Sequence, residues 1–190
     1  MYRILTASKD TYITDKIIKS TFRSEDANVG KASTLDIFKL YGESYLSGTE
    51  NPVELSRGLV KFDLNPLREI TGSFLDIGSS TFKVKLRLSD VYGGQTTPSN
   101  FKIIVFPLSK SFDEGIGRDI INFSHLDSSN FLTASVSNGA VDAWFVSGAN
   151  KQGLLGSADI DIISSGNLND GNGVVNLWKS QTFSEGNEDL

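Results

Sequence analysis

The sequence predicts an all-β protein: a jelly-roll-like antiparallel β-sandwich with at most one short helix. Three observations predict this class. Short apolar stretches recur along the chain, apolar and polar residues alternate within several of them, and turn-forming residues separate them. The 190 residues include 18 glycines but only 4 prolines, so glycine supplies most of the turns. With 38% hydrophobic residues the chain can build a core, and we expect one domain over residues 1–190.

The predicted strands share a short length and flanking turn residues. They are residues 11–18, 34–41, 59–64, 80–91, 101–108, 132–136, 142–146, 158–163 and 174–178. Segment 101–108 is the densest in apolar residues, so we expect it to lie deeper than the others.

The clearest alternation lies in residues 81–88. Strand geometry places every second side chain on the same face. One face is apolar and the other is basic: Phe82, Val84, Leu86 and Leu88 against Lys83, Lys85 and Arg87. We expect a strand whose apolar face is buried and whose basic face is exposed.

The stretch 56–64 predicts a strand that stops at Asn65-Pro66, because proline has no backbone N–H to donate. We expect Leu59, Val60, Phe62 and Leu64 to lie in this strand, with Phe62 in the core. Arg57 and Asp63 have two interpretations. Arg57 could bind a ligand through its guanidinium fork. The favoured interpretation is structural: Arg57 anchors a loop and Asp63 caps the turn before the proline.

The remaining segments are predicted mainly as loops. These are residues 43–54, 135–140, 148–157 and 164–173. Residues 116–126 are the one helical candidate, but their apolar residues do not share a face, so we expect a short helical turn there and no more.

Charge and composition exclude several function classes. The formal net charge is −5 and the basic residues are scattered, so nucleic-acid binding is not indicated. Cysteine is absent and there is one histidine, so a structural zinc site is excluded. The first ten residues lack the apolar run of a signal peptide and no stretch has the length of a membrane helix, so we expect synthesis in the cytoplasm.

The candidate catalytic groups do not form a convincing set. Ser124, His125 and Asp127 are the residue types of a hydrolytic triad, but such triads are assembled from separate segments. A loop or surface histidine is the favoured interpretation. Three carboxylate pairs could serve glycoside hydrolysis: Asp113 with Glu114, Asp159 with Asp161, and Glu188 with Asp189. We expect Asp159 and Asp161 to form the polar face of a strand, and we predict no catalytic residue.

Calcium is the better metal hypothesis, and it stays open. Residues 167–173 offer several Asn and Asp oxygens, which suit a hard cation. The same residue types favour tight turns, which is the preferred explanation. Gly115 and Gly117 lack the remaining glycines of a nucleotide-binding loop, so no cofactor is predicted.

The order of several motifs resembles the DNRLRE-type domain. The motifs are residues 10–13, the turn and strand of 26–37, and the stretch 56–64. Residues 101–111, 112–117, 130–135 and Trp144 continue the resemblance, with Phe112 where the family commonly has tryptophan. The resemblance implies an all-β jelly-roll module of the kind found in bacterial surface proteins and phage virions.

This resemblance implies a non-enzymatic structural protein of a bacteriophage virion, a docking or decorating module in the tail, baseplate or capsid. Its partners would be other virion proteins, with self-association, and neither nucleic acid nor membrane. The alternative is a carbohydrate-binding module that recognises a host surface glycan. Its aromatic candidates are Tyr41, Tyr45, Tyr92, Trp144 and Trp178, of which both tryptophans lie in apolar segments that suggest burial.

Residues 183–190 resemble the approach to a further strand of that domain. We therefore expect that the chain is the N-terminal portion of a longer protein, or that a neighbouring subunit supplies the missing strand.

Overall fold

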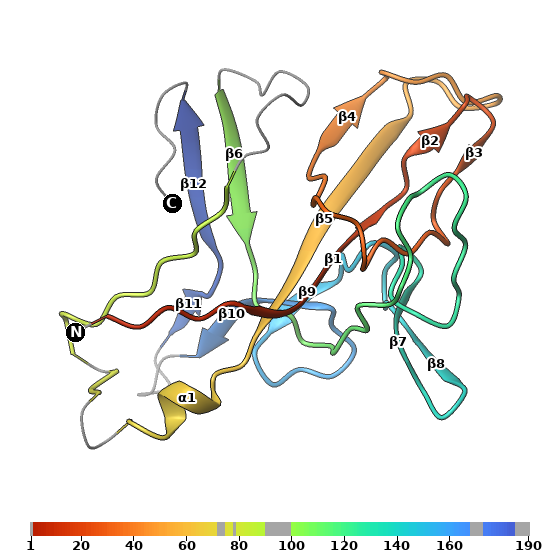
Figure 1. Ribbon diagram of the computed structural model, residues 1–190. Helices are drawn as coiled ribbons and strands as arrows, with labels where there is room; N and C mark the ends of the chain where they lie inside the picture. The colour runs from red at the N-terminus through yellow and green to blue at the C-terminus, as the bar shows by residue number, and fades with distance from the viewer. Residues whose placement is uncertain (1, 72–74, 78, 90–99, 168–172, 185–190) are drawn as a thin grey trace. The chain divides into compact units, whose positions relative to one another are not determined.

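The computed structural model describes residues 2–71, 75–77, 79–89, 100–167 and 173–184. Over these residues the protein is all-β, with one helix of four residues, which confirms the predicted class. Twelve strands and this helix follow one another along the described chain (Figure 1). They are β1 (Ala7–Thr14), β2 (Ile17–Ile18), β3 (Phe22–Arg23), β4 (Lys39–Tyr41), β5 (Val53–Phe62), α1 (Asn65–Arg68), β6 (Asn100–Val105), β7 (Thr133–Ser137), β8 (Ala140–Ala143), β9 (Gln152–Leu154), β10 (Ile162–Asn167), β11 (Val174–Asn176) and β12 (Lys179–Ser184).

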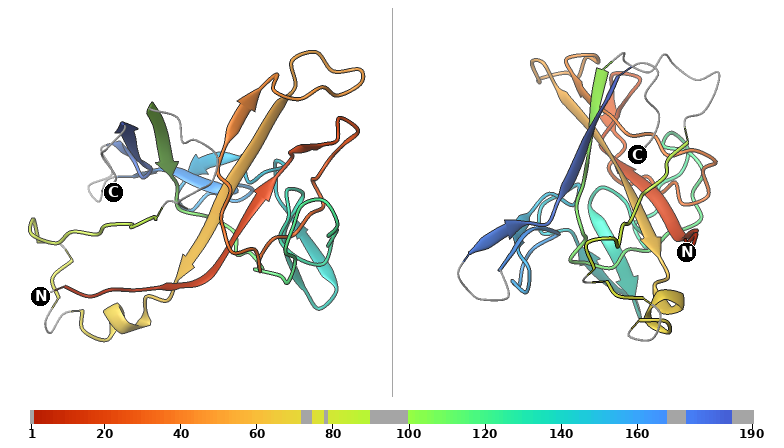
Figure 2. Two further views of the ribbon diagram at one scale, coloured as in Figure 1. Left: turned by 45° about the horizontal axis from the view of Figure 1, so that its top comes forward. Right: turned by 90° about the vertical axis from the view of Figure 1, so that its left-hand side faces the viewer.

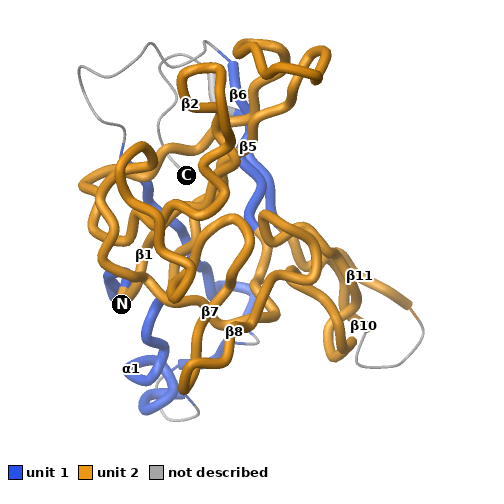
Figure 3. The backbone as a smooth tube through the Cα atoms, turned by 90° about the vertical axis from the view of Figure 1, so that its right-hand side faces the viewer, with its two compact units in different colours: residues 1–7, 62–105, 179–190 blue, residues 8–61, 106–178 orange. Residues whose placement is uncertain are grey.

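The chain divides into two compact units, each built from separate stretches of sequence (Figure 3). Unit 1 comprises residues 1–7, 62–105 and 179–190, and unit 2 comprises residues 8–61 and 106–178. The two units interleave along the sequence, with no linker between them. That the chain is a single domain stays a prediction.

The main sheet of unit 2 has the strand order β1-β5-β4. Strands β4 and β5 are antiparallel, with Lys39 opposite Leu55 and Tyr41 opposite Val53. Strand β1 is antiparallel to β5 too, because Ser8 Oγ bonds to Lys61 O while Asp15 N bonds to Leu55 O. Figure 2 shows β5 as the long central strand of this sheet.

The hydrophobic core lies in unit 2 and joins segments from both halves of the sequence. Its buried members are Ile13, Leu59, Phe112, Ala134, Trp144 and Ala149. Burying a large apolar side chain stabilises a fold by roughly 1.5–3 kcal/mol. Trp144 also satisfies its polar atom, since Nε1 donates to the carbonyl oxygen of Asn130 at 2.9 Å. The expected burial of this tryptophan is confirmed.

Strands β7 and β8 form a hairpin where the sequence had predicted a loop over residues 135–140. The turn residues Asn138 and Gly139 have φ values of 51° and 78°, both in the left-handed region. A two-residue turn of this kind matches the twist of an antiparallel hairpin, and Asn-Gly is its preferred sequence. The loop prediction over these residues is wrong, because the Asn138-Gly139 turn lets the segments on either side pair as strands.

The prediction of a strand over residues 81–88 is wrong, because these residues pair with no strand in the described part of the chain. Residues 82–89 belong to no strand. The three basic side chains are exposed as expected, and Phe82, Leu86 and Leu88 are half-buried. Val84, however, is 80% exposed. Alternation favours an extended backbone, but a strand also needs a hydrogen-bonding neighbour, and the described residues supply none.

Strand β5 extends further toward the N-terminus than predicted and ends at Phe62. Leu59 is the buried apolar member of this stretch, while Phe62 is half-buried and Leu64 is exposed. The expectation that Phe62 lies in the core is therefore wrong. The strand ends before Asn65-Pro66, so Leu64 lies outside it, and Asn65-Pro66 instead begins α1, since proline suits the first turn of a helix.

Other predicted elements differ from the structure in ways that follow from hydrogen bonding. Residues 101–108 are not deep: β6 pairs with β12, and Ile104 and Val105 are exposed. Residues 116–126 contain no helix. Their backbone N–H groups are used elsewhere, as when the Asp119 carboxylate accepts from Ile121 and Asn122. The strands at 34–41, 142–146 and 158–163 are shorter or displaced, as the bounds of β4, β8 and β10 show.

Candidate functional site

Two of the motifs behind the family resemblance, residues 26–37 and 112–117, meet at the side chain of Asn28, which is completely buried. Its Nδ2 donates to the carbonyl oxygens of Glu114 and Ser129 and to the Ser128 hydroxyl, at 2.7 to 3.1 Å. Its Oδ1 accepts from the backbone N–H of Gly30 at 3.3 Å and of Gly117 at 2.8 Å. One carboxamide therefore holds three separate segments of the chain together.

Close backbone approach explains the glycines around Asn28. A Cβ on Gly30 would overlap the backbone of Glu114, and a Cβ on Gly117 would overlap the backbone of Asn28. Phe112, where the family commonly has tryptophan, is buried in the core beside this junction. The motif residues thus have a packing role, which is independent of any ligand.

Arg57 anchors a loop, which confirms the structural interpretation. Its Nη1 donates to the carbonyl oxygen of Gly148, and its Nη2 donates to Asn150 Oδ1 at 2.8 Å. Burial lowers the pKa of this guanidinium, an effect opposed by the charge of Asp161. Asp63 also has its expected role, because its Oδ1 accepts from the backbone N–H of Asn65 at 3.0 Å.

Asp161 also binds the loop that Arg57 contacts. It is fully buried, and it accepts from the backbone N–H groups of Phe145, Val146 and Lys151 at 2.8 to 3.0 Å. Asp159 is exposed and has a φ of 56°. The expectation that both lie on an exposed polar face is wrong, because Asp161 is needed inside to satisfy loop N–H groups.

The Ser124, His125 and Asp127 candidates do not form a described catalytic arrangement. His125 is half-buried, packs edge-on against Phe123 at 6.0 Å and donates its backbone N–H to Asp26 O. Among the described residues, its buried Nδ1 has no hydrogen-bond partner. A base that activates a serine needs an orienting carboxylate at this atom.

The paired carboxylates have structural partners where they are described. Asp113 Oδ2 accepts from Val136 N at 2.7 Å, and Glu114 forms an ion pair with Lys31 at 2.9 Å. Glu188 and Asp189 lie outside the described residues. So does most of the calcium candidate, residues 167–173. Within the described ranges, no three His, Cys, Asp or Glu side chains gather as a metal site would require.

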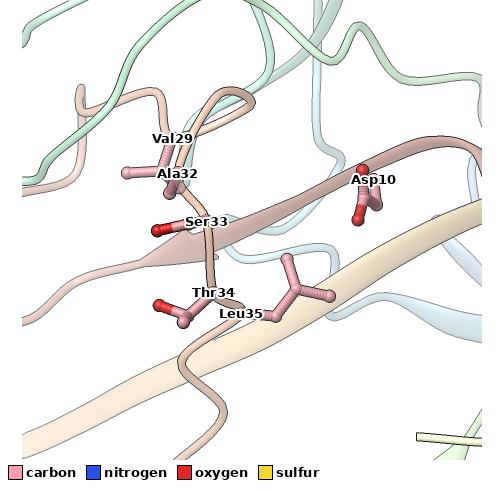
Figure 4. A pocket seen from close by; sticks show the side chains of 6 residues that line it. All are labelled: Asp10, Val29, Ala32, Ser33, Thr34 and Leu35. Carbon is pink, nitrogen blue, oxygen red and sulfur yellow. The ribbon is translucent and has the colours of Figure 1, made fainter. Parts of the chain in front are cut away.

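A hollow in unit 2 lies along β1 and the segment after Asn28 (Figure 4). Its volume is about 50 Å³, and its lining residues are Asp10, Val29, Ala32, Ser33, Thr34 and Leu35. A hollow of this size is too small for a sugar or a nucleotide, since ligand pockets typically span about 300–1,000 Å³.

The β4–β5 hairpin carries two exposed aromatic residues that could bind a sugar in the alternative, carbohydrate-binding function. Tyr41 is 64% exposed and Tyr45 is 68% exposed. Tyr45 borders an open hollow of about 580 Å³ that Glu43, Glu50 and the rest of this loop also line. An exposed ring beside carboxylates is the arrangement that a saccharide needs for stacking and hydroxyl contacts.

The other aromatic candidates are less suited to this role. Trp144 is buried, and Trp178 is half-buried with its ring tilted against Phe106 at 6.4 Å between centroids. Tyr92 lies outside the described residues.

The side chains of unit 1 are less buried than those of unit 2. None of the described side chains of unit 1 is buried, whereas every buried residue belongs to unit 2. The large apolar side chains that unit 1 exposes are Tyr2, Ile4, Leu64, Ile77, Val84, Ile104 and Val105. Sequence reasoning placed Val84 in a core, so it missed this surface.

Comparisons with protein-family models, with curated proteins and with solved structures found no match. No helix within the described ranges is both long enough and apolar enough to cross a membrane.

Proposed function

We propose that this chain is a non-enzymatic structural protein of a bacteriophage virion that acts as a docking or decorating module. The motif order of the DNRLRE-type domain supports the virion setting. One structural observation supports a docking role: unit 1 buries none of its described side chains.

The sheet of unit 1 has only two strands and no buried side chain among its described residues. Strands β6 and β12 form a two-stranded antiparallel sheet, with Lys179 opposite Val105 and Ser184 opposite Asn100. A two-stranded sheet is marginally stable by itself in water, and it gains stability when a further surface covers one face. The exposed apolar side chains of unit 1, among them Val84, Ile104 and Val105, are available to such a surface. Unit 1 is therefore the part of the chain that docks.

Particle composition tests this function. Virions are purified from the phage whose genome encodes this chain, and their proteins are quantified by mass spectrometry. We expect the chain at a constant ratio to the major capsid or tail protein across the density-gradient peak. A chain that is absent from the peak, or whose ratio varies across it as for a contaminating host protein, would refute the proposal.

A second candidate function rests on Tyr41 and Tyr45 of the β4–β5 hairpin. In this alternative the chain binds a host surface glycan by stacking a sugar ring on Tyr45. A glycan array with the purified chain tests it, using Tyr45→Ala as the disabled variant. Tyr2→Ala is the matched control, because Tyr2 is 89% exposed in the other unit. Binding that Tyr45→Ala abolishes and Tyr2→Ala retains would favour this alternative.

A further inference from the structure

We propose that residues 82–88 form an intermolecular strand, which pairs with a strand edge on a second copy of this chain. The inference rests on the proposed function, and it identifies which segment of unit 1 docks and what it docks against.

The described residues offer residues 83–88 of this segment no backbone partner. Residues 82–89 are neither helix nor strand. Within the described part of the chain, the backbone groups of residues 83–89 form no backbone hydrogen bond. An extended segment with open N–H and C=O groups adds readily to the edge of a sheet.

The side chains of the segment separate into two faces. Phe82, Leu86 and Leu88 are half-buried and Val84 is 80% exposed. The intervening Lys83, Lys85 and Arg87 are all exposed. A pairing strand would cover the apolar face with its neighbours' side chains and leave the basic face to meet acidic ones.

The positive charge of this segment favours a second copy of the chain as its partner. The chain has a formal net charge of −5 although this segment carries three positive side chains, so the remainder of the chain is more negative still. The basic segment of one copy is therefore attracted to the rest of another copy.

The same charges exclude pairing of the segment with itself. In an antiparallel self-pair that keeps the apolar faces together, Lys83 would lie opposite Arg87 and Lys85 opposite Lys85, and like charges directly opposite are destabilising. A register shifted by one residue would place apolar side chains on the basic face. The segment must contact a different edge of the second copy. Such a head-to-tail contact propagates from copy to copy into a ring or a filament.

Sedimentation velocity over a range of concentrations tests the proposal. We expect the wild-type chain to form oligomers larger than a dimer, and high salt to weaken them. Val84→Asp should weaken association at least about tenfold. Because Val84 is already 80% exposed, this variant should keep the thermal unfolding midpoint of the wild type.

A matched pair of charge variants completes the test. Lys83→Glu, Lys85→Glu and Arg87→Glu together should abolish association. The control combines Lys19→Glu, Lys61→Glu and Arg118→Glu, three exposed positions elsewhere with the same change in net charge. The control should associate much as the wild type does. Equal loss in both charge variants would mean that net charge, and not this segment, drives association, and would overturn the proposal.

A wild-type chain that stays monomeric at all concentrations would also overturn it. The proposed function would survive that result if the chain were still found in virions, because a different virion protein would then be the partner. Absence of the chain from virions would instead refute the proposed function while leaving self-association to be judged by sedimentation.

Discussion

The side-chain oxygen of Asn28 accepts a hydrogen bond from the backbone N–H of Gly117 at 2.8 Å, which joins two motifs 89 residues apart in the sequence. The same side chain donates to Glu114, Ser128 and Ser129, so every polar atom of a fully buried carboxamide has a partner. The junction therefore depends on the donors of an amide as much as on its acceptor.

Asn28→Asp keeps the size of this side chain but removes its donors and buries a charge. We expect the free energy of unfolding to fall by about 3 kcal/mol or more, because several buried carbonyl oxygens lose their partner. Urea denaturation followed by tryptophan fluorescence measures this change. Asn176→Asp, on the exposed strand β11, is the control and should change stability by less than about 0.5 kcal/mol. Equal losses in the two variants would contradict the role of Asn28.

Asp161→Asn should destabilise the loop over residues 145–151. Asp161 Oδ2 accepts from both Val146 N and Lys151 N, and an asparagine cannot present an acceptor to all three of the N–H groups that Asp161 binds. We expect a loss of about 3 kcal/mol in unfolding free energy. Asp159→Asn is the matched control, because Asp159 is exposed and asparagine tolerates its positive φ. The interpretation fails if the two substitutions have the same effect.

The ion pair of Glu114 with Lys31 predicts a loss of stability in acid. The hydrogen bond from Lys31 holds the pKa of Glu114 below its ordinary value of 4.5. Because the folded pKa is the lower one, this stabilisation is present above the ordinary value and is lost as the pH falls through the folded pKa. Urea midpoints at pH 7 and at several values below 4.5 should fall more in the wild type than in Glu114→Gln. Parallel curves for the two proteins would contradict this coupling.

Tyr12 should ionise above the ordinary pKa of a tyrosine. Burial, with the nearby charges of Asp36 and Asp119, raises the pKa of Tyr12 from 10.0 to about 12. The resulting stabilisation is present below pH 10 and is lost as the pH rises toward the folded value. A spectrophotometric titration of tyrosinate should show a late step, which Tyr12→Phe removes. Persistence of that step in Tyr12→Phe would assign it to another tyrosine.

Local patterns in the sequence predicted the fold class and several side-chain roles. The cap by Asp63 and the anchor by Arg57 each follow from the chemistry of one residue type beside its neighbours. The burial of Trp144 follows from its apolar surroundings. These features depend on short stretches of chain, so a sequence carries enough information to predict them.

Features that depend on distant partners were predicted poorly. Asp161 stands between Ile160 and Ile162, and alternation predicts an exposed carboxylate between two buried isoleucines, but all three side chains are buried. Its carboxylate is buried because a separate loop offers three N–H groups. Residues 82–88 have the alternation of a strand, yet pairing requires a second strand that alternation does not supply. The buried network of Asn28 likewise joins segments that no local pattern connects.

We propose that this chain is a structural module that docks through unit 1. A density map of the assembled virion is the most direct test. We expect repeated copies of the chain within the particle, with residues 82–88 paired as an added strand on the sheet edge of a neighbouring copy. A particle that lacks the chain would contradict the proposed function. A particle in which residues 82–88 face only solvent would contradict the proposed docking segment.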